Sequence, residues 1–263
     1  MGYRRAFSTL GCPELSLDEA IALAERYQID AIELRALGGQ LDLPRYLSGK
    51  FQNPAILADR MRNSPVKIAT LDTSFKLIGH EPADRSALLE FVPWAEALEV
   101  KYLRIFDGGH DAGDGDIHQA TETIEWWREV RKTQGWKTDL MIETHDAFVT
   151  TQAIQRLLRS LPDLNILWDA HHTWKKDGED PLTTWTALKK NIVHIHVKDS
   201  VHRPSEKLPF TYVPPGEGEF PVAPLLKFLR EEFSGILSLE WEKIWHRYLA
   251  PLDVALSSAA SKS

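Results

Sequence analysis

Polar side chains that could bind a metal ion lie on one face of a short apolar segment. His194, His196 and Lys198 alternate there with Ile195 and Val197, and residues two apart in a β-strand share a face. Two imidazoles and an ammonium on one face of an apolar strand are costly to bury without partners. We therefore expect partners from other strands of the same kind.

Three further apolar segments, residues 140–142, 164–168 and 236–239, each lead into an acidic side chain. These side chains are Glu143, Asp169 and Glu240. Three carboxylates and one imidazole form a mixed oxygen and nitrogen set that suits Mn²⁺, Mg²⁺, Co²⁺ or Zn²⁺. Such groups would repel one another without a cation, unless each is paired separately with a lysine or an arginine. Their order along the chain favours one divalent metal ion bound by Glu143, Asp169, His196 and Glu240.

The segments that carry these residues alternate with amphipathic helical patterns from end to end of the chain. Eight strand–helix units follow one another at a spacing of about 25–40 residues, as in βα repeats. The strands are apolar on both faces, as parallel strands covered by helices must be. We predict an α/β fold, a (β/α)8 TIM barrel, with residues 1–263 as a single domain. A doubly wound open sheet is the weaker alternative, because no Gly-x-Gly-x-x-Gly turn follows the first strand.

The patterns predict bounds for each element. Strands are expected at residues 4–10, 30–37, 66–75, 101–107, 139–144, 164–169, 192–197 and 235–241. Helices are expected after Ser16, after Asn53, and at residues 82–98, 117–133, 151–160, 182–189, 222–232 and 248–256. Pro93 should kink or split the helix that contains it. The small polar residues 257–263 are expected to fray.

The composition limits the kinds of partner and the cellular compartment that we expect. Cys12 is the single cysteine, which excludes an internal disulfide and favours a reducing compartment, the cytoplasm. We find no signal peptide and no run of about 18 apolar residues for a membrane span. A net charge of −7 argues against nucleic acid, which attracts basic faces. Apolar helix faces and aromatic loops are compatible with a homodimer.

The ordered set of polar residues resembles the xylose-isomerase-like TIM-barrel superfamily, which includes sugar phosphate isomerases and epimerases. The shared pattern is Glu ending strand five, Asp-x-x-His ending strand six, His-x-His on strand seven and Glu on strand eight. Here these are Glu143, Asp169 with His172, His194-Ile195-His196, and Glu240. The phrase Ile32-Glu33-Leu34-Arg35 also matches. The resemblance covers roughly the whole chain and is strongest from Asp139 to Glu242.

The resemblance implies one divalent metal on the four predicted ligands and a carbohydrate substrate flanked by Glu143 and Glu240, which act as general base or acid. A metal bound to a carbonyl and a hydroxyl acidifies the adjacent C–H bond. We therefore predict an isomerase or epimerase of a sugar, keto sugar or cyclitol, with a dehydratase or lyase as the alternative. An endonuclease IV-like phosphodiesterase is disfavoured, because that chemistry needs further metal ligands for which this chain has few candidates, namely His80, His110, Asp199 and His202.

Other polar residues have two readings each. His145 is either an acid/base group or a hydrogen-bond partner behind the ligands, whereas His172 is expected to contact substrate or shuttle a proton. Lys198 either stabilises a substrate anion or neutralises Glu240. His194 is expected to be a buried, satisfied histidine.

The first half of the chain supplies three more such residues. Glu33 and Arg35 share a face of strand two and are expected to support the site from outside the ligand set. Arg104 lies mid-strand, where an unpaired guanidinium would be costly, so it should pair with Glu33 or Glu143 or contact substrate. Within the proline- and glycine-rich residues 203–220, the segment Tyr212–Glu219 resembles the Pro-Gly-x-Gly loop after strand seven of this family. This segment is expected to form a lid or rim.

Overall fold

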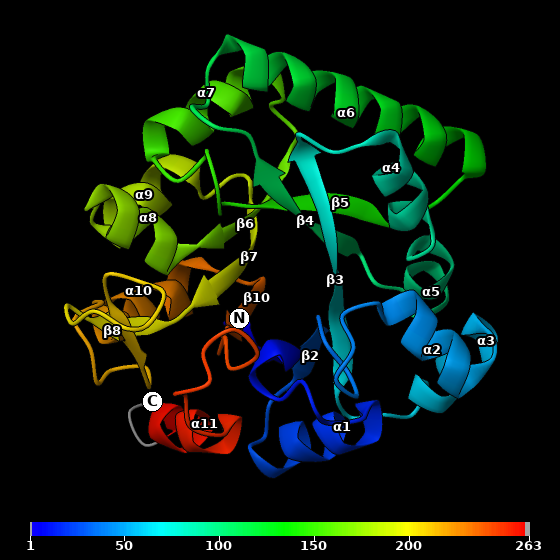
Figure 1. Ribbon diagram of the computed structural model, residues 1–263, viewed down its shortest axis with the longest axis horizontal. Coiled ribbons are helices and arrows are strands. Elements are labelled where there is room, and N and C mark those ends of the chain that lie inside the picture. The colour runs from blue at the N-terminus through cyan, green and yellow to red at the C-terminus, as the bar shows by residue number, and fades with distance from the viewer. Residues whose placement is uncertain (1, 261–263) are drawn as a thin grey trace.

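Eight parallel strands close into a barrel in the computed structural model, which describes residues 2–260 (Figure 1). The order around the barrel is β1-β10-β7-β6-β5-β4-β3-β2. The strands are β1 (Arg4–Ser8), β2 (Ala31–Leu34), β3 (Lys67–Ile78), β4 (Tyr102–Gly108), β5 (Asp139–Glu143), β6 (Asn165–Asp169), β7 (Ile192–Val197) and β10 (Ile236–Leu239). The predicted single-domain (β/α)8 fold is confirmed.

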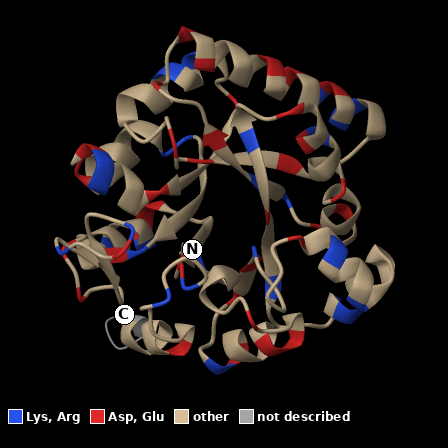
Figure 2. Ribbon diagram, in the orientation of Figure 1, with Lys and Arg blue, Asp and Glu red and all other residues tan. Residues whose placement is uncertain are grey.

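Helices cover the outside of the barrel, as Figure 1 shows. A 3-10 turn, Thr9–Gly11, follows β1, and the α-helices are α1 (Leu17–Arg26), α2 (Leu43–Phe51), α3 (Pro54–Met61), α4 (Pro82–Leu89), α5 (Val92–Ala97), α6 (Asp114–Gln134), α7 (Thr151–Ser160), α8 (Ala170–Asp177), α9 (Pro181–Leu188), α10 (Val222–Glu232) and α11 (Leu252–Ala260). Both signs of charge are spread over these helices (Figure 2). Among residues 2–260, none of the helices combines the length and apolar character that crossing a bilayer requires.

Local sequence signals explain where several helices begin. Ser16 and Glu19 form a reciprocal capping box at the start of α1, which satisfies two backbone N–H groups at once. Asn53 caps α3 and Pro54 is its first residue, as predicted. The predicted helix at residues 82–98 is split into α4 and α5, and Pro93 lies in the first turn of α5, where its missing N–H is harmless.

Other boundaries differ from the prediction. We did not predict α2, although Asp42 caps it and Pro44 lies in its first turn. We also did not predict α8, which starts directly after the last residue of β6. The last helix begins four residues later than expected and continues to Ala260, so residues 257–260, expected to fray, are helical. Residues 261–263 lie outside the part that the structure describes. The eighth barrel strand ends at Leu239, which leaves Glu240 just beyond it.

The proline- and glycine-rich residues 203–220, which include the predicted lid Tyr212–Glu219, contain a short strand. Residues Asp199–Val201 (β8) pair antiparallel with Thr211–Val213 (β9). Beyond β9 the chain folds back onto Asp199, whose carboxylate accepts the N–H groups of Ser200, Gly216, Gly218 and Phe220 at 2.8–3.0 Å. Gly218 is required there, because a Cβ atom would collide with the Asp199 carboxylate.

Replacing Asp199 with alanine is expected to lower the free energy of unfolding by about 2–4 kcal/mol, because several buried N–H groups lose a charged acceptor. Chemical denaturation followed by circular dichroism measures this change. The matched control is Asp111→Ala, which removes an exposed carboxylate that accepts one N–H, from Gly113. Equal stability losses in the two variants would show that Asp199 does not anchor the segment.

Candidate metal centre

The four predicted metal ligands come together at the carboxyl end of the barrel. Glu143 and Asp169 are the last residues of β5 and β6, His196 lies near the end of β7, and Glu240 follows β10. Strand register places Asp169 directly beside His196. All four are buried, and one possible ligand atom from each lies within 4.8 Å of the others. The parallel strands therefore bring together side chains that are nearly a hundred positions apart in the sequence.

His196 is oriented by a carboxylate behind it. Its Nε2 lies 3.0 and 3.1 Å from the two oxygens of Glu33, while its Nδ1 lies 3.4 Å from both Glu143 Oε1 and Glu240 Oε2. An Nε2–H donated to Glu33 leaves the Nδ1 lone pair facing those two carboxylates. A carboxylate that fixes a histidine tautomer in this way is the usual support for a metal-binding imidazole.

Most of the possible ligand atoms lack hydrogen bonds. Within residues 2–260, both oxygens of Glu143, Oδ2 of Asp169 and Nδ1 of His196 are buried and have no hydrogen-bond partner, whereas Glu240 Oε2 accepts one from Lys198. Buried polar atoms are normally satisfied, so four such atoms in one place form a suitable ligand set for a cation. Carboxylate oxygens and an imidazole nitrogen are also suitable donors for a divalent metal. The residues present therefore fit the metal that we predicted from the sequence.

Basic side chains also approach the ligand set. Lys198 Nζ lies 2.8 Å from Asp169 Oδ2 and contacts Glu240 Oε2 and Glu242 Oε1. Arg104 Nε lies 3.3 Å from Glu143 Oε2, one of the pairings predicted for it. Some of the carboxylates are therefore paired with basic residues, which is the alternative to a metal site that the sequence left open.

Charge balance nevertheless leaves a deficit of positive charge. The carboxylates of the ligand set and of the side chains that contact it are Glu33, Glu143, Asp169, Glu240 and Glu242, and the cations that act on them are Arg35, Arg104 and Lys198. Burial and the neighbouring Glu33 charge raise the pKa of Asp72 well above its ordinary value, which favours its neutral form, so Asp72 is left out of this balance. Five carboxylates against three cations leave two negative charges, which one divalent ion would neutralise.

The excess of negative charge also affects the pKa of His196. Burial alone would lower the pKa of its imidazole, but Glu33 and Glu240 together raise that pKa well above the ordinary value. Without a bound cation, His196 is thus driven to hold a proton on the nitrogen that faces the carboxylates. A metal ion at this position would take the place of that proton.

Lys198 is a cation that several of these carboxylates share. Burial would lower its pKa, but Asp169, Glu240 and Glu242 raise it well above the ordinary value, so the ammonium is charged. Conversely, burial would raise the pKa of Glu240, and Lys198 and His196 hold it well below its ordinary value. Tyr212 donates a hydrogen bond of 3.1 Å to Glu242, which ties the β8–β9 segment to this network.

The Asp-x-x-His spacing has a local structural cause. Asp169 is the N-cap of α8, and its Oδ1 accepts the backbone N–H of His172 at 2.9 Å. This cap holds the two residues side by side, so that His172 Nε2 lies 3.4 Å from Lys198 Nζ and its Nδ1 lies 3.2 Å from the Thr144 carbonyl. Burial and the Lys198 charge lower the pKa of His172 well below the ordinary value. His172 is therefore a neutral imidazole inside the site.

His145 lies farther from the metal ligands than strand alternation suggested. β5 ends at Glu143, so the alternation stops before His145, which lies in the following loop. Its Nδ1 lies 2.8 Å from Asp146 Oδ1 and its side chain is 38% exposed. Its ring meets the ring of His172 edge-on, at 5.1 Å. His145 thus lies at the rim of the barrel, where its side chain can contact a bound substrate but not the metal ligands.

The opposite wall of the barrel supplies groups that the sequence had shown only in part. Asp72 on β3, which we did not single out, lies 3.6 Å from Arg104 Nη2. His194, expected to be buried and satisfied, is buried with its Nε2 2.8 Å from Glu33. Neither Asp72 nor Tyr212 could be identified easily from the sequence. Asp72 is a single acidic residue in a largely apolar strand, and Tyr212 lies in a segment that we interpreted as a loop.

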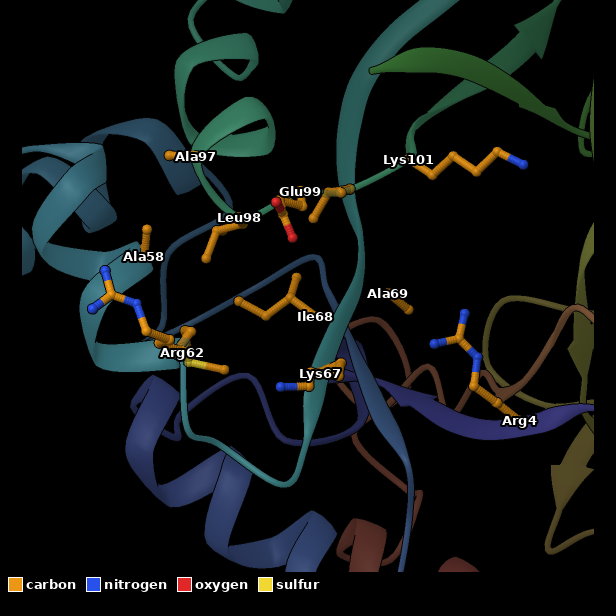
Figure 3. Close-up of a pocket in the computed structure, with 12 residues that line it drawn as sticks. Arg4, Ala58, Arg62, Lys67, Ile68, Ala69, Ala97, Leu98, Glu99 and Lys101 are labelled. Carbon is orange, nitrogen blue, oxygen red and sulfur yellow. The ribbon is translucent and has the colours of Figure 1, made fainter. Parts of the chain in front are cut away.

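One cavity lies at the amino end of the barrel, away from these residues. It has a volume of about 540 Å³ and is lined by Arg4, Arg62, Lys67 and Lys101 among others. Figure 3 shows Arg4 and Lys101 on one side of β3 and Arg62 and Lys67 on the other. Because these cations diverge, the cavity does not present a single anion site.

Comparisons with known proteins agree with the fold. A family model described as "Xylose isomerase-like TIM barrel" matches residues 21–259. No curated protein matches the chain in sequence.

Three solved structures show how the likeness extends over whole chains. The probable 3-DHS dehydratase of petrobactin synthesis from Bacillus anthracis is 18% identical, with a TM-score of 0.78 over 99% of this chain and 98% of that one. The IolI protein with a bound zinc atom is 18% identical, with a TM-score of 0.72 over 98% and 96%. The 3-keto-D-glucoside 4-epimerase from E. coli is 13% identical, with a TM-score of 0.70 over 98% of each chain. At these identities the likeness shows the fold.

Proposed function

Because the chain belongs to the xylose isomerase-like TIM barrel family, we propose that it is a divalent-metal-dependent isomerase or epimerase of a sugar, keto sugar or cyclitol. The main support is the set of Glu143, Asp169, His196 and Glu240, whose facing atoms converge within 4.8 Å and mostly lack hydrogen bonds. The zinc atom bound by the IolI protein supports the choice of a divalent cation.

The four side chains would hold the metal, which when bound acidifies a C–H bond next to a carbonyl. Glu143 and Glu240 come from strands on either side of β7 in the barrel, and both approach Nδ1 of His196 at 3.4 Å. Each would present a carboxylate to a different side of a bound substrate. One of them accepts the proton, and returning it to another carbon or face gives isomerisation or epimerisation. Lys198, which contacts Glu240, stabilises the negative charge that develops on the substrate oxygen.

A dehydratase or lyase is the second candidate, and one contact favours it. His172 Nε2 lies 3.4 Å from Lys198 Nζ, and both residues lie beside Asp169. Elimination requires a proton donor for the departing hydroxyl in addition to a base for the C–H proton. Lys198 and His172 together would supply that donor, and the TM-score of 0.78 to a probable dehydratase agrees with such chemistry.

Metal analysis tests the first step of the proposal. We expect about one equivalent of divalent metal per chain in the purified protein, since a single four-ligand site is present. Removal with a chelator should abolish turnover, and one of the four predicted metals should restore it. Two or three equivalents together with cleavage of abasic DNA would instead favour the disfavoured phosphodiesterase, and no bound metal would contradict the proposal.

Exchange with deuterated water separates the two candidate reactions. The protein is incubated with a panel of keto sugars and cyclitols in D₂O and followed by NMR. Uptake of deuterium at carbon without loss of water supports an isomerase or epimerase. Loss of water or of an alkoxyl group supports a dehydratase or lyase.

A further inference from the structure

Arg35 is a buried cation that has almost no partner. It follows β2 directly and is 5% exposed. Among residues 2–260, the one side-chain hydrogen bond of its guanidinium goes from Nη2 to Ser74 Oγ at 2.8 Å, and no carboxylate oxygen lies within 4.0 Å. A guanidinium has five N–H donors, so most of those of Arg35 are unused.

The other two cations of the site are paired. Arg104 has Asp72 and Glu143 within 3.6 Å, and Lys198 contacts three carboxylates. A buried charge without such a partner costs free energy in the isolated protein. Arg35 therefore differs from its neighbours in being free to receive an anion.

Arg35 lies near the candidate metal centre. It directly follows β2, which carries Glu33, and Glu33 reaches across the barrel to His196. The guanidinium of Arg35 lies beside β3, because its Nη2 donates to Ser74. Burial and Arg104 lower the pKa of Arg35 to about 10, while the charges of Glu143 and Glu240 act in the opposite direction. Arg35 is thus charged at neutral pH and lies within electrostatic reach of the candidate metal centre, on the wall opposite β5, β6 and β7.

We propose that Arg35 binds a carboxylate of the substrate, so that the enzyme acts on an acid: a hydroxylated keto acid or an acid sugar. The proposal rests on the proposed function, because it assumes that the reacting end of the substrate is held by the four metal ligands. The planar fork of a guanidinium matches a carboxylate with two parallel hydrogen bonds.

The surroundings of Arg35 favour a carboxylate over a phosphate. A phosphate ester carries up to two negative charges and is usually held by several cations or by backbone N–H groups. Here one free guanidinium lies within electrostatic reach of Glu143 and Glu240, and these carboxylates would repel a second negative charge on the ligand. A singly charged group is therefore the better match.

Matched pairs of acids and neutral analogues test this inference by isothermal titration calorimetry. The probes are D-glucuronate and D-glucose, D-galacturonate and D-galactose, D-gluconate and sorbitol, and quinate and its methyl ester, each titrated into the metal-loaded full chain. We expect at least one acid to bind at least tenfold more tightly than its neutral partner. Arg35→Gln should weaken the acid at least tenfold and the neutral partner less than twofold, and Arg35→Lys should restore part of the preference.

The matched control is Arg45→Gln, which removes an exposed arginine from α2 and should leave the preference unchanged. If no acid in the panel is preferred, or if the preference survives Arg35→Gln, the inference is overturned. Arg35→Lys serves as the test if Arg35→Gln does not fold. Metal content is measured on the same samples without any probe, so a protein that binds no metal contradicts the proposed function, whereas a metal-loaded protein without acid preference contradicts only the role of Arg35.

Discussion

Replacement of Glu240 by glutamine is expected to lower kcat by about 10³-fold or more, with little change in the fold. Glutamine has nearly the same shape as glutamate, but its amide is a poor metal ligand and a poor base. Glu240 Oε2 lies 3.4 Å from His196 Nδ1 and contacts Lys198, so the substitution affects metal binding and proton transfer together. The loss should therefore lie in the upper part of the range expected from removal of a base alone, about 10²–10⁴-fold.

The measurement is turnover of whichever substrate the exchange panel identifies, together with metal content and thermal unfolding of each variant. Glu125→Gln, which changes an exposed glutamate on α6, is the matched control and should retain full activity. Activity of Glu240→Gln within tenfold of the unsubstituted enzyme would rule out the role that we assign to this residue.

The barrel could be predicted from the sequence because its signals are local and repeated. The pattern of an apolar strand followed by an amphipathic helix occurs eight times along the chain. Residues 192–197 were predicted with the observed bounds. Helix ends were predictable where a capping residue or proline marks them, as at Ser16 and Pro93. α8 carried no such mark, since its cap is Asp169, a residue that already belonged to a strand.

The positions of the four ligands could be predicted for a related reason. A parallel barrel brings the carboxyl ends of its strands to one rim, so residues at those ends must meet. The contacts across the barrel could not be predicted in this way. Glu33 and His196 are 163 positions apart, and nothing in either strand shows that their side chains point at each other rather than at different partners.

His145 shows where the periodicity argument stops. A period of two holds only while the chain remains a strand, and β5 ends two residues before His145. Asp107, whose carboxylate accepts the N–H groups of His145, Asp146 and Phe148, then holds the backbone in a loop. The prediction of a catalytic role for His145 is thus still to be tested, but from a position at the rim.

Substitution of Lys198 by methionine is expected to destabilise the metal-free protein by about 3–5 kcal/mol at pH 7. Breaking a buried ion pair by removing one partner leaves uncompensated charge, and here the carboxylates of Asp169, Glu240 and Glu242 all lose the same ammonium. Methionine keeps most of the volume of lysine, so cavity formation contributes little. The effect should therefore be electrostatic, and its dependence on pH should show this.

The contribution of Glu242 to stability should respond to acid in opposite directions in the two proteins. In the unsubstituted protein, burial would raise the pKa of Glu242, but Lys198 and His246 lower it to about 2. A lowered carboxyl pKa stabilises the fold above the ordinary value of 4.5 and loses that contribution as the pH falls toward 2. In Lys198→Met, burial and mutual repulsion raise the carboxyl pKa values instead, so protonation relieves the strain and the destabilisation shrinks as the pH falls from 7 toward 5.

Denaturant unfolding in the presence of a chelator, at several pH values between 4 and 8, measures this difference. The matched control is Lys189→Met, since Lys189 lies 3.0 Å from Glu232 in a pair whose side chains are about half exposed. That substitution should cost less than about 1 kcal/mol and show no such pH dependence. A Lys198→Met variant whose stability loss is small, or constant across this range, would mean that water or protonation already balances the carboxylates. In that case the surplus negative charge on which the metal assignment depends would not exist.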